Sequence, residues 1–170
     1  MRALKLALLS FFILFAVVTA IGLMFPSTVK VSRAVNITAS YDTVYKYLND
    51  VKYWKLWMAG ADTATLVFIS LKTEGPGTVA KIGMSGEISM LRSTQDSIFS
   101  DWKSGEGNIQ HSVFTLLKDA TNNVTTAQWS FEQHLNWYPW ERFGSMANDK
   151  VLGPIMEQSL DKLKKVLEKK

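Results

Sequence analysis

The sequence predicts an α+β domain, in which a curved antiparallel sheet of six or seven strands wraps around a long C-terminal helix. One transmembrane helix precedes this domain. Three observations carry the prediction. Residues 6–25 are uncharged and almost wholly apolar, residues 29–134 hold short strand-like segments separated by turn residues, and residues 152–167 carry an apolar stripe with helical spacing.

The apolar N-terminal stretch, Leu6 to Phe25, forms a helix about 30 Å long, which matches the hydrocarbon core of a bilayer. A cleaved signal peptide is the alternative, with a candidate cleavage site at Val18-Thr19-Ala20. The apolar run continues past Ala20, which favours an uncleaved anchor. We therefore assign residues 1–28 to a membrane anchor and residues 29–170 to the domain.

Basic residues flank this anchor on both sides. Arg2 and Lys5 favour a cytoplasmic N-terminus, which places the domain outside the cytoplasm as part of a single-pass membrane protein. Lys30 and Arg33 on the other side reduce this asymmetry.

The composition of the domain excludes several function classes. Seventeen basic and fifteen acidic residues follow Pro26, and a net charge of +2 gives little support for nucleic-acid binding. The chain has no cysteine, which excludes disulfides, thiolate metal sites and cysteine nucleophiles. It also has no HExxH, P-loop or dinucleotide-binding fingerprint, so we expect no cofactor, no metal and no standard catalytic site.

The first half of the domain mixes helical and strand patterns. Residues 29–37 alternate and predict a strand, and Ser40 caps the helix that follows. Trp54 and Trp57 share one face of a short helical turn and are expected to close one end of the core. Four further strands are predicted at residues 63–71, 78–84, 87–92 and 98–103, with a turn at Gly75-Pro76-Gly77.

The last two strands, residues 109–118 and 124–134, form a hairpin. A two-residue Asn122-Asn123 turn pairs Phe114 with Phe131, and it places His111 opposite His134. A shift by two residues changes these partners but not the faces. The two histidines project away from the apolar face, which favours a surface pair over a metal or acid–base site.

The C-terminal region is helical. Its apolar stripe consists of Leu152, Ile155, Met156, Leu160, Leu163 and Leu167. Gly153-Pro154 interrupts the stripe and predicts a short helix, a break, and a longer helix that begins near Pro154.

Taken in order, these segments resemble the START-like helix-grip superfamily (SRPBCC), specifically its polyketide cyclase/dehydrase-like branch. The resemblance covers residues 29–168. Asp50, Trp54 and Trp57 fit the family's capped helix followed by a Trp-x-x-Trp turn, and Gly75 to Val79 resembles its glycine turn. Residues 114–129 resemble its last hairpin, and residues 141–168 its closing helix.

The resemblance implies a helix-grip fold with an apolar cavity between the sheet and the last helix. Members of the superfamily bind lipids, sterols, quinones or polyketides, and a few catalyse cyclisation or dehydration. The expected cavity-lining residues, which are the ligand-binding candidates, are Ile82, Met84, Ile88, Met90, Trp102, Phe114, Leu116, Trp129, Phe131 and Met156.

Three hypotheses follow. The first is a membrane-tethered binding module for a small hydrophobic or amphipathic ligand, such as a lipid, quinone or polyketide-like molecule. The second is a cyclase or dehydratase of an apolar substrate, which needs an acid–base group inside the cavity. The third is a scaffold domain whose own side chains fill that space. The oligomeric state is not indicated by the sequence.

Overall fold

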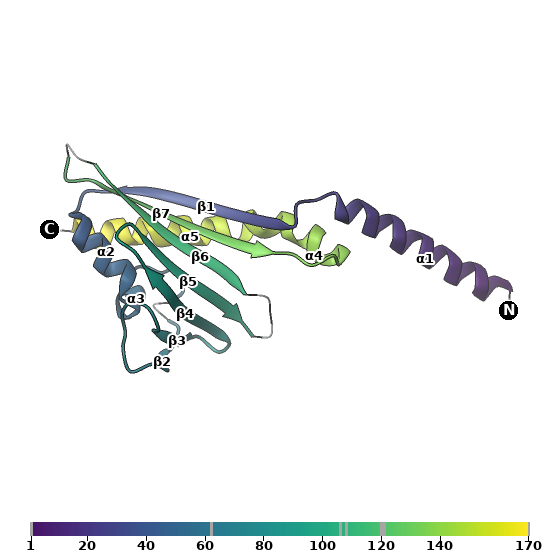
Figure 1. Cartoon of the computed structure of the whole chain (residues 1–170), viewed down its shortest axis with the longest axis horizontal. Helices are drawn as coiled ribbons and strands as arrows, with labels where there is room; N and C mark the ends of the chain where they lie inside the picture. Colours follow the sequence, from purple (N-terminus) through teal and green to yellow (C-terminus); the bar gives the residue numbers. More distant parts are fainter. Residues whose placement is uncertain (1, 62, 106, 108, 120–121, 170) are drawn as a thin grey trace.

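The computed structural model describes residues 2–61, 63–105, 107, 109–119 and 122–169. Helix α1 projects from one end of an α+β domain, and α5 runs along the sheet of that domain (Figure 1). The elements are α1 (Arg2–Leu23), β1 (Thr28–Ile37), α2 (Tyr41–Asn49), η1 (Val51–Tyr53), α3 (Trp54–Trp57), β2 (Leu66–Phe68), β3 (Val79–Ile82), β4 (Gly86–Ser93), β5 (Ser97–Ser104), β6 (Gln110–Lys118), β7 (Thr125–His134), α4 (Pro139–Gly144), η2 (Ser145–Ala147) and α5 (Asn148–Glu168).

The seven strands form one antiparallel sheet in the order β1-β7-β6-β5-β4-β3-β2, which confirms the predicted fold class. Neighbouring strands are antiparallel, so at the end of the sheet nearest α1 some strands begin and their neighbours end. Thr28 begins β1 there, Ile82 ends β3, Gln110 begins β6 and His134 ends β7. We call this end of the sheet, where β1 begins, the α1 end.

The core lies between the sheet and α5. Strands β6 and β7 alternate as predicted, with Phe114, Leu116, Trp129 and Phe131 buried and their neighbours more exposed. Trp54 and Trp57 are fully buried beneath them, as an apolar pair at helical spacing should be. The predicted faces are therefore confirmed.

The pairing register of the last hairpin differs from the prediction by two residues. Phe114 lies opposite Trp129 rather than Phe131, and His111 lies opposite Glu132 rather than His134. A longer connection than a two-residue turn causes this shift, because pairing already stops at Lys118 and Thr125. The faces are unchanged, and both histidines remain exposed on the side away from α5.

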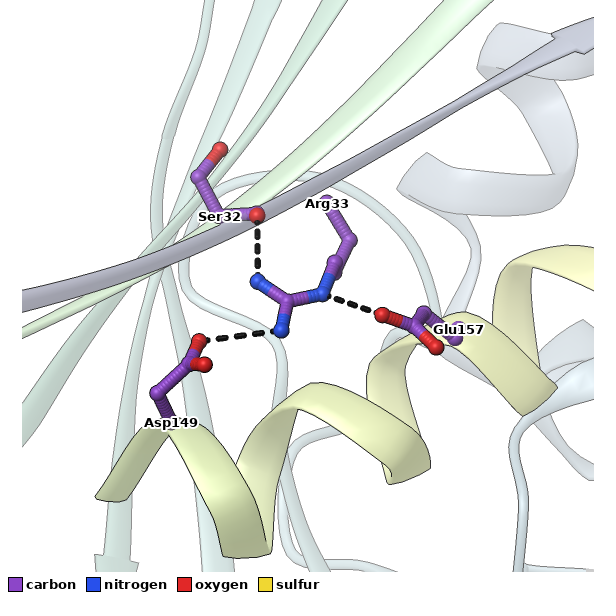
Figure 2. Close-up of polar contacts among 4 residues, drawn as sticks. All are labelled: Ser32, Arg33, Asp149 and Glu157. Atoms are coloured by element: carbon purple, nitrogen blue, oxygen red, sulfur yellow. Dashed lines mark hydrogen bonds and ion pairs between the residues drawn. The ribbon is translucent and has the colours of Figure 1, made fainter. Parts of the chain in front are cut away.

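The predicted break before Pro154 is wrong, because α5 is continuous from Asn148 through Pro154 to Glu168. A proline inside a helix removes one backbone hydrogen bond, so other contacts must hold this turn in place. Arg33 supplies such contacts from β1. Its inward-facing position places the guanidinium across α5 between Asp149 and Glu157 (Figure 2).

Glycine at position 153 makes room for that guanidinium. A Cβ atom at this position would overlap Arg33 Nη2. Arg33 Nη2 lies 2.9 Å from Asp149 Oδ1, Nε lies 2.5 Å from Glu157 Oε1, and Nη1 donates to the carbonyl of Ser32. The hydrogen bond to Glu157 is the main cause that raises the pKa of Arg33, and the hydrogen bond to Asp149 is the second.

Candidate functional site: an apolar cavity between the sheet and α5

A cavity of about 320 Å³ lies between the sheet and the first half of α5. This volume is at the lower end of the range that small-molecule pockets span. The lining residues are Met58, Ala59, Gly60, Ala61, Ala64, Ile82, Gly83, Trp102, Gln110, Trp129, Phe131, Leu152, Ile155 and Met156.

Three parts of the chain build the walls. The sheet supplies residues of β3, β5, β6 and β7, α5 supplies one helical face, and the loop after α3 supplies small residues. This loop is tied to α5 by the buried Ser159. The Ser159 hydroxyl donates to the carbonyl of Ile155 and accepts a 3.0 Å hydrogen bond from the N–H of Ala59. The wall that this loop forms is therefore held against α5.

Two tryptophans form much of the sheet wall, and both indole N–H groups have partners within the sheet. Trp102 Nε1 donates to Ser100 Oγ at 3.1 Å, and Trp129 Nε1 donates to Ser112 Oγ at 2.8 Å. Ser100 and Ser112 are buried and pair across β5 and β6. With their polar atoms satisfied, the indoles are oriented so that they contribute apolar surface to the cavity.

The cavity carries no charge among the residues described as lining it. None of them is titratable, and Gln110 is the one polar side chain. Gln110 Nε2 already donates to Gln133 Oε1 at 3.3 Å. Such walls bind a ligand through burial of apolar surface and dispersion contacts rather than through ion pairs.

Five of the ten residues predicted from the sequence line this cavity: Ile82, Trp102, Trp129, Phe131 and Met156. Four others, Ile88, Met90, Phe114 and Leu116, are buried but do not line it; they belong to the packed core.

The tenth residue, Met84, corrects the sequence-based prediction. Its side chain is fully exposed, because β3 ends at Ile82 and Gly83 turns the chain with a φ of 63°. Strand alternation does not extend past such a turn, so the parity that placed Met84 beside Ile82 does not apply.

The loop after α3 contributes lining residues that the sequence analysis did not anticipate. Ala59, Gly60, Ala61 and Ala64 leave room where larger side chains would fill the space. The run of small residues in this loop is the sequence feature that could have indicated the cavity. Leu152 and Ile155 lie on the predicted helical stripe, but their position at the cavity depends on the tilt of α5, which the sequence does not specify.

A larger depression of about 900 Å³ lies at the opposite end of the sheet. It is lined by Ser40, Tyr41, Asp42, Tyr45, Thr94, Gln95, Asp96, Leu116, Leu117, Lys118 and Asn123. Burial is the main cause that raises the pKa of Tyr41, whose hydroxyl donates to the carbonyl of Gln95. Asp42, Asp96 and Lys118 in its lining make this depression a poorer candidate for an apolar ligand.

The profile of the polyketide cyclase/dehydrase and lipid transport family matches residues 28–168, which is most of the chain. The chain belongs to this family. The match begins with β1 and ends with α5, so the whole helix-grip domain is a family domain and α1 lies outside it.

Solved structures share the fold of this family domain at low sequence identity. A protein from Nitrosospira multiformis has a TM-score of 0.66 at 10% identity, over 83% of this chain and 97% of its own. A START superfamily protein from Mycobacterium smegmatis has a TM-score of 0.58 at 13% identity, over 81% and 98%. Truncated norcoclaurine synthase from Thalictrum flavum has a TM-score of 0.62 at 14% identity, over 84% and 96%.

No curated protein matches the chain. The neighbours therefore establish the fold, and the function rests on the chemistry of the cavity.

Proposed function

We propose that this protein is a membrane-tethered binding module for a small hydrophobic or amphipathic molecule, held in the cavity between the sheet and α5. The uncharged lining of that cavity carries the proposal. Each methylene group of a ligand that leaves water for such a site contributes about 0.8 kcal/mol. Ile82, Trp102, Trp129, Phe131 and Met156 would form the main contacts, together with Leu152 and Ile155.

The position of the cavity supports delivery of the ligand from a bilayer. Ile82 and Gly83 at the end of β3 and Gln110 at the start of β6 lie at the α1 end of the sheet. Helix α1 is long and apolar enough to cross a membrane, a property that signal sequences share. As an uncleaved anchor, with Arg2 and Lys5 on the cytoplasmic side, α1 would hold the cavity close to the membrane surface that faces away from the cytoplasm.

A cyclase or dehydratase is the alternative that the family's description favours. Such chemistry needs a group that accepts or donates a proton within reach of the substrate. The described lining residues include no titratable side chain, which supports binding over this alternative. The presence of about 320 Å³ of space likewise supports binding over a scaffold whose side chains fill the domain.

Native mass spectrometry of the full chain, purified from membranes in mild detergent, tests the proposal. We expect a bound apolar molecule of defined mass on the wild-type protein. Ala64→Phe places a ring at the cavity lining and should abolish copurification of this molecule. Ala34→Phe makes the same change at an exposed position of β1 and should leave the bound fraction unchanged.

The outcomes separate the hypotheses. A wild-type protein that is consistently empty, or an equal bound fraction in both phenylalanine variants, would argue against this cavity as a ligand site. A chemically altered product after incubation with the copurified molecule would favour the enzyme.

A further inference from the structure

Four aromatic residues gather at the α1 end of the domain, and we call them the aromatic patch: Trp137, Tyr138, Trp140 and Phe143. Trp137 is 52% exposed and Trp140 is 62% exposed, far more than the other tryptophans of the chain that line or fill the core. The ring centroids of Tyr138 lie 4.7 Å from Trp137 and 4.8 Å from Trp140. The patch is thus a preformed apolar surface that faces solvent.

The patch is joined directly to the end of α1. Gly22 in the last turn of α1 is buried against α4, where a Cβ would lie 3.5 Å from Pro139 Cα. Arg142 Nη1 donates to the carbonyl of Phe25 at 2.8 Å, and Phe25 and Phe143 make an edge-to-face contact at 5.4 Å. Figure 1 shows α4 beside the end of α1 from which β1 departs.

Arg142 holds this junction from the other side as well. It is 7% exposed, and its Nε donates to the carbonyl of Asn136 at 2.7 Å. Asn136 is also bound to Glu141, because the backbone N–H of Asn136 donates to Glu141 Oε2 at 2.9 Å. Through Arg142, the patch and the preceding residue Asn136 are therefore held against Phe25, the last residue of the apolar stretch.

We infer that the aromatic patch is a second membrane contact, which inserts into the headgroup region of the bilayer that α1 spans. This inference rests on the proposed membrane anchor. The apolar stretch ends at Phe25, so α4, which contacts Phe25 and Gly22, lies level with the boundary of the hydrocarbon core. Tryptophan and tyrosine concentrate at this depth, where their rings are apolar and their N–H and O–H groups reach water.

Two contacts rather than one would fix how the domain sits on the membrane. A single helix followed by a loop allows the domain to rotate and tilt, whereas a rigid α1–α4 junction with a flanking aromatic contact does not. The α1 end of the sheet, with the cavity residues Ile82 and Gln110, would then face the lipid surface persistently.

The distribution of tryptophans provides a direct test. The chain has six, of which Trp54, Trp57 and Trp129 are buried and Trp102 is half-buried. The full chain is reconstituted in phosphatidylcholine vesicles that contain lipids brominated near the glycerol end of their acyl chains. Bromine quenches tryptophan on contact, so quenching should come mainly from Trp137 and Trp140. In Trp137→Phe/Trp140→Phe the quenched intensity should fall about threefold or more.

Vesicle flotation and aqueous iodide complete the test. A chain that floats with vesicles but is quenched by iodide and not by bromolipid keeps its anchor and overturns the patch inference. A floating chain that neither agent quenches at these positions has the patch covered by protein, which also overturns it. A chain that does not float overturns the anchor, and the inference with it. Quenching by bromolipid that persists in the double variant also overturns the inference, because the lipid contact then lies elsewhere in the chain.

Discussion

At the scale of single residues, the apolar cavity depends on polar side chains behind its walls. Trp129 is 2% exposed and its indole N–H would be an unsatisfied donor without Ser112 Oγ. An unpaired buried donor costs more than the hydrogen bond itself contributes, because its hydration is lost without replacement. Ser112 and Ser100 thereby allow large indoles to line an apolar space.

Ser112→Ala should therefore lower the free energy of unfolding by about 1–3 kcal/mol. Ser130→Ala, in the adjacent strand, removes a half-buried hydroxyl whose hydrogen bond to the carbonyl of Val113 is long, at 3.4 Å, and therefore weak. It should change the free energy by less than about 0.5 kcal/mol. Chemical denaturation of the detergent-solubilised chain measures both. Equal effects would show that the Ser112–Trp129 hydrogen bond contributes little.

Arg33 and Gly153 depend on each other in a similar way. Alanine is favoured over glycine inside a helix by about 1 kcal/mol, so Gly153→Ala alone would be expected to stabilise α5. The new Cβ, however, occupies the place of the Arg33 guanidinium.

We expect Gly153→Ala to be neutral or destabilising in the wild-type chain and stabilising by about 1 kcal/mol in an Arg33→Met background. The four melting curves of this double-mutant cycle provide the measurement. An identical effect of Gly153→Ala in both backgrounds would contradict the close approach of Arg33 to the helix.

At the scale of elements, one contact near each end of α5 holds this helix to β1 or to the residue that follows β1. Arg33 holds the first turns, and at the other end Glu168 Oε1 accepts a 2.7 Å hydrogen bond from the N–H of Thr38. This hydrogen bond is the main cause that lowers the pKa of Glu168 below its ordinary value of 4.5, and the charge of Lys164 adds to it.

A carboxylate whose pKa is lowered in the folded state stabilises the fold above its ordinary pKa and loses this contribution as the pH falls through the lower, folded value. Acidification from pH 5 towards pH 3 should therefore destabilise the wild-type chain more than Glu168→Gln, which cannot ionise. Melting temperatures across this range measure the difference. Parallel pH profiles would show that the contact between Glu168 and Thr38 does not form in solution.

The elements also show which features the sequence could predict. Alternation over residues 109–134 and the stripe from Leu152 to Leu167 were sufficient for the strands, the long helix and their buried faces, because these patterns have fixed periods. The hairpin register depended on a loop whose length the Asn122-Asn123 pair did not reveal. Met84 was misplaced because parity was carried past the end of β3 at Ile82.

Pro154 illustrates a further limit, since its place inside α5 depends on residues far away in the chain. Local rules placed a helix start at this proline, whereas the helix continues through it and is held from β1 by Arg33. Likewise, four of the expected cavity residues, Ile88, Met90, Phe114 and Leu116, belong to the packed core, because the tilt of α5 decides which buried side chains border a space.

At the scale of the whole molecule, three features are gathered at the α1 end of the sheet. They are the apolar helix, the aromatic patch, whose Phe143 packs against Phe25 just after that helix, and the part of the cavity that Ile82 and Gln110 line. The opposite end carries the polar depression around Tyr41 and the hairpin of β6 and β7. The proposed exchange of an apolar molecule with a bilayer depends on this arrangement.

A crystal structure of the chain purified from membranes, with any copurified molecule retained, tests the proposed binding function most directly. We predict continuous non-protein density between Trp102, Trp129 and Met156, and none in the Ala64→Phe variant. A cavity that is empty in the wild-type protein, or filled by its own rearranged side chains, would contradict a binding function for this domain.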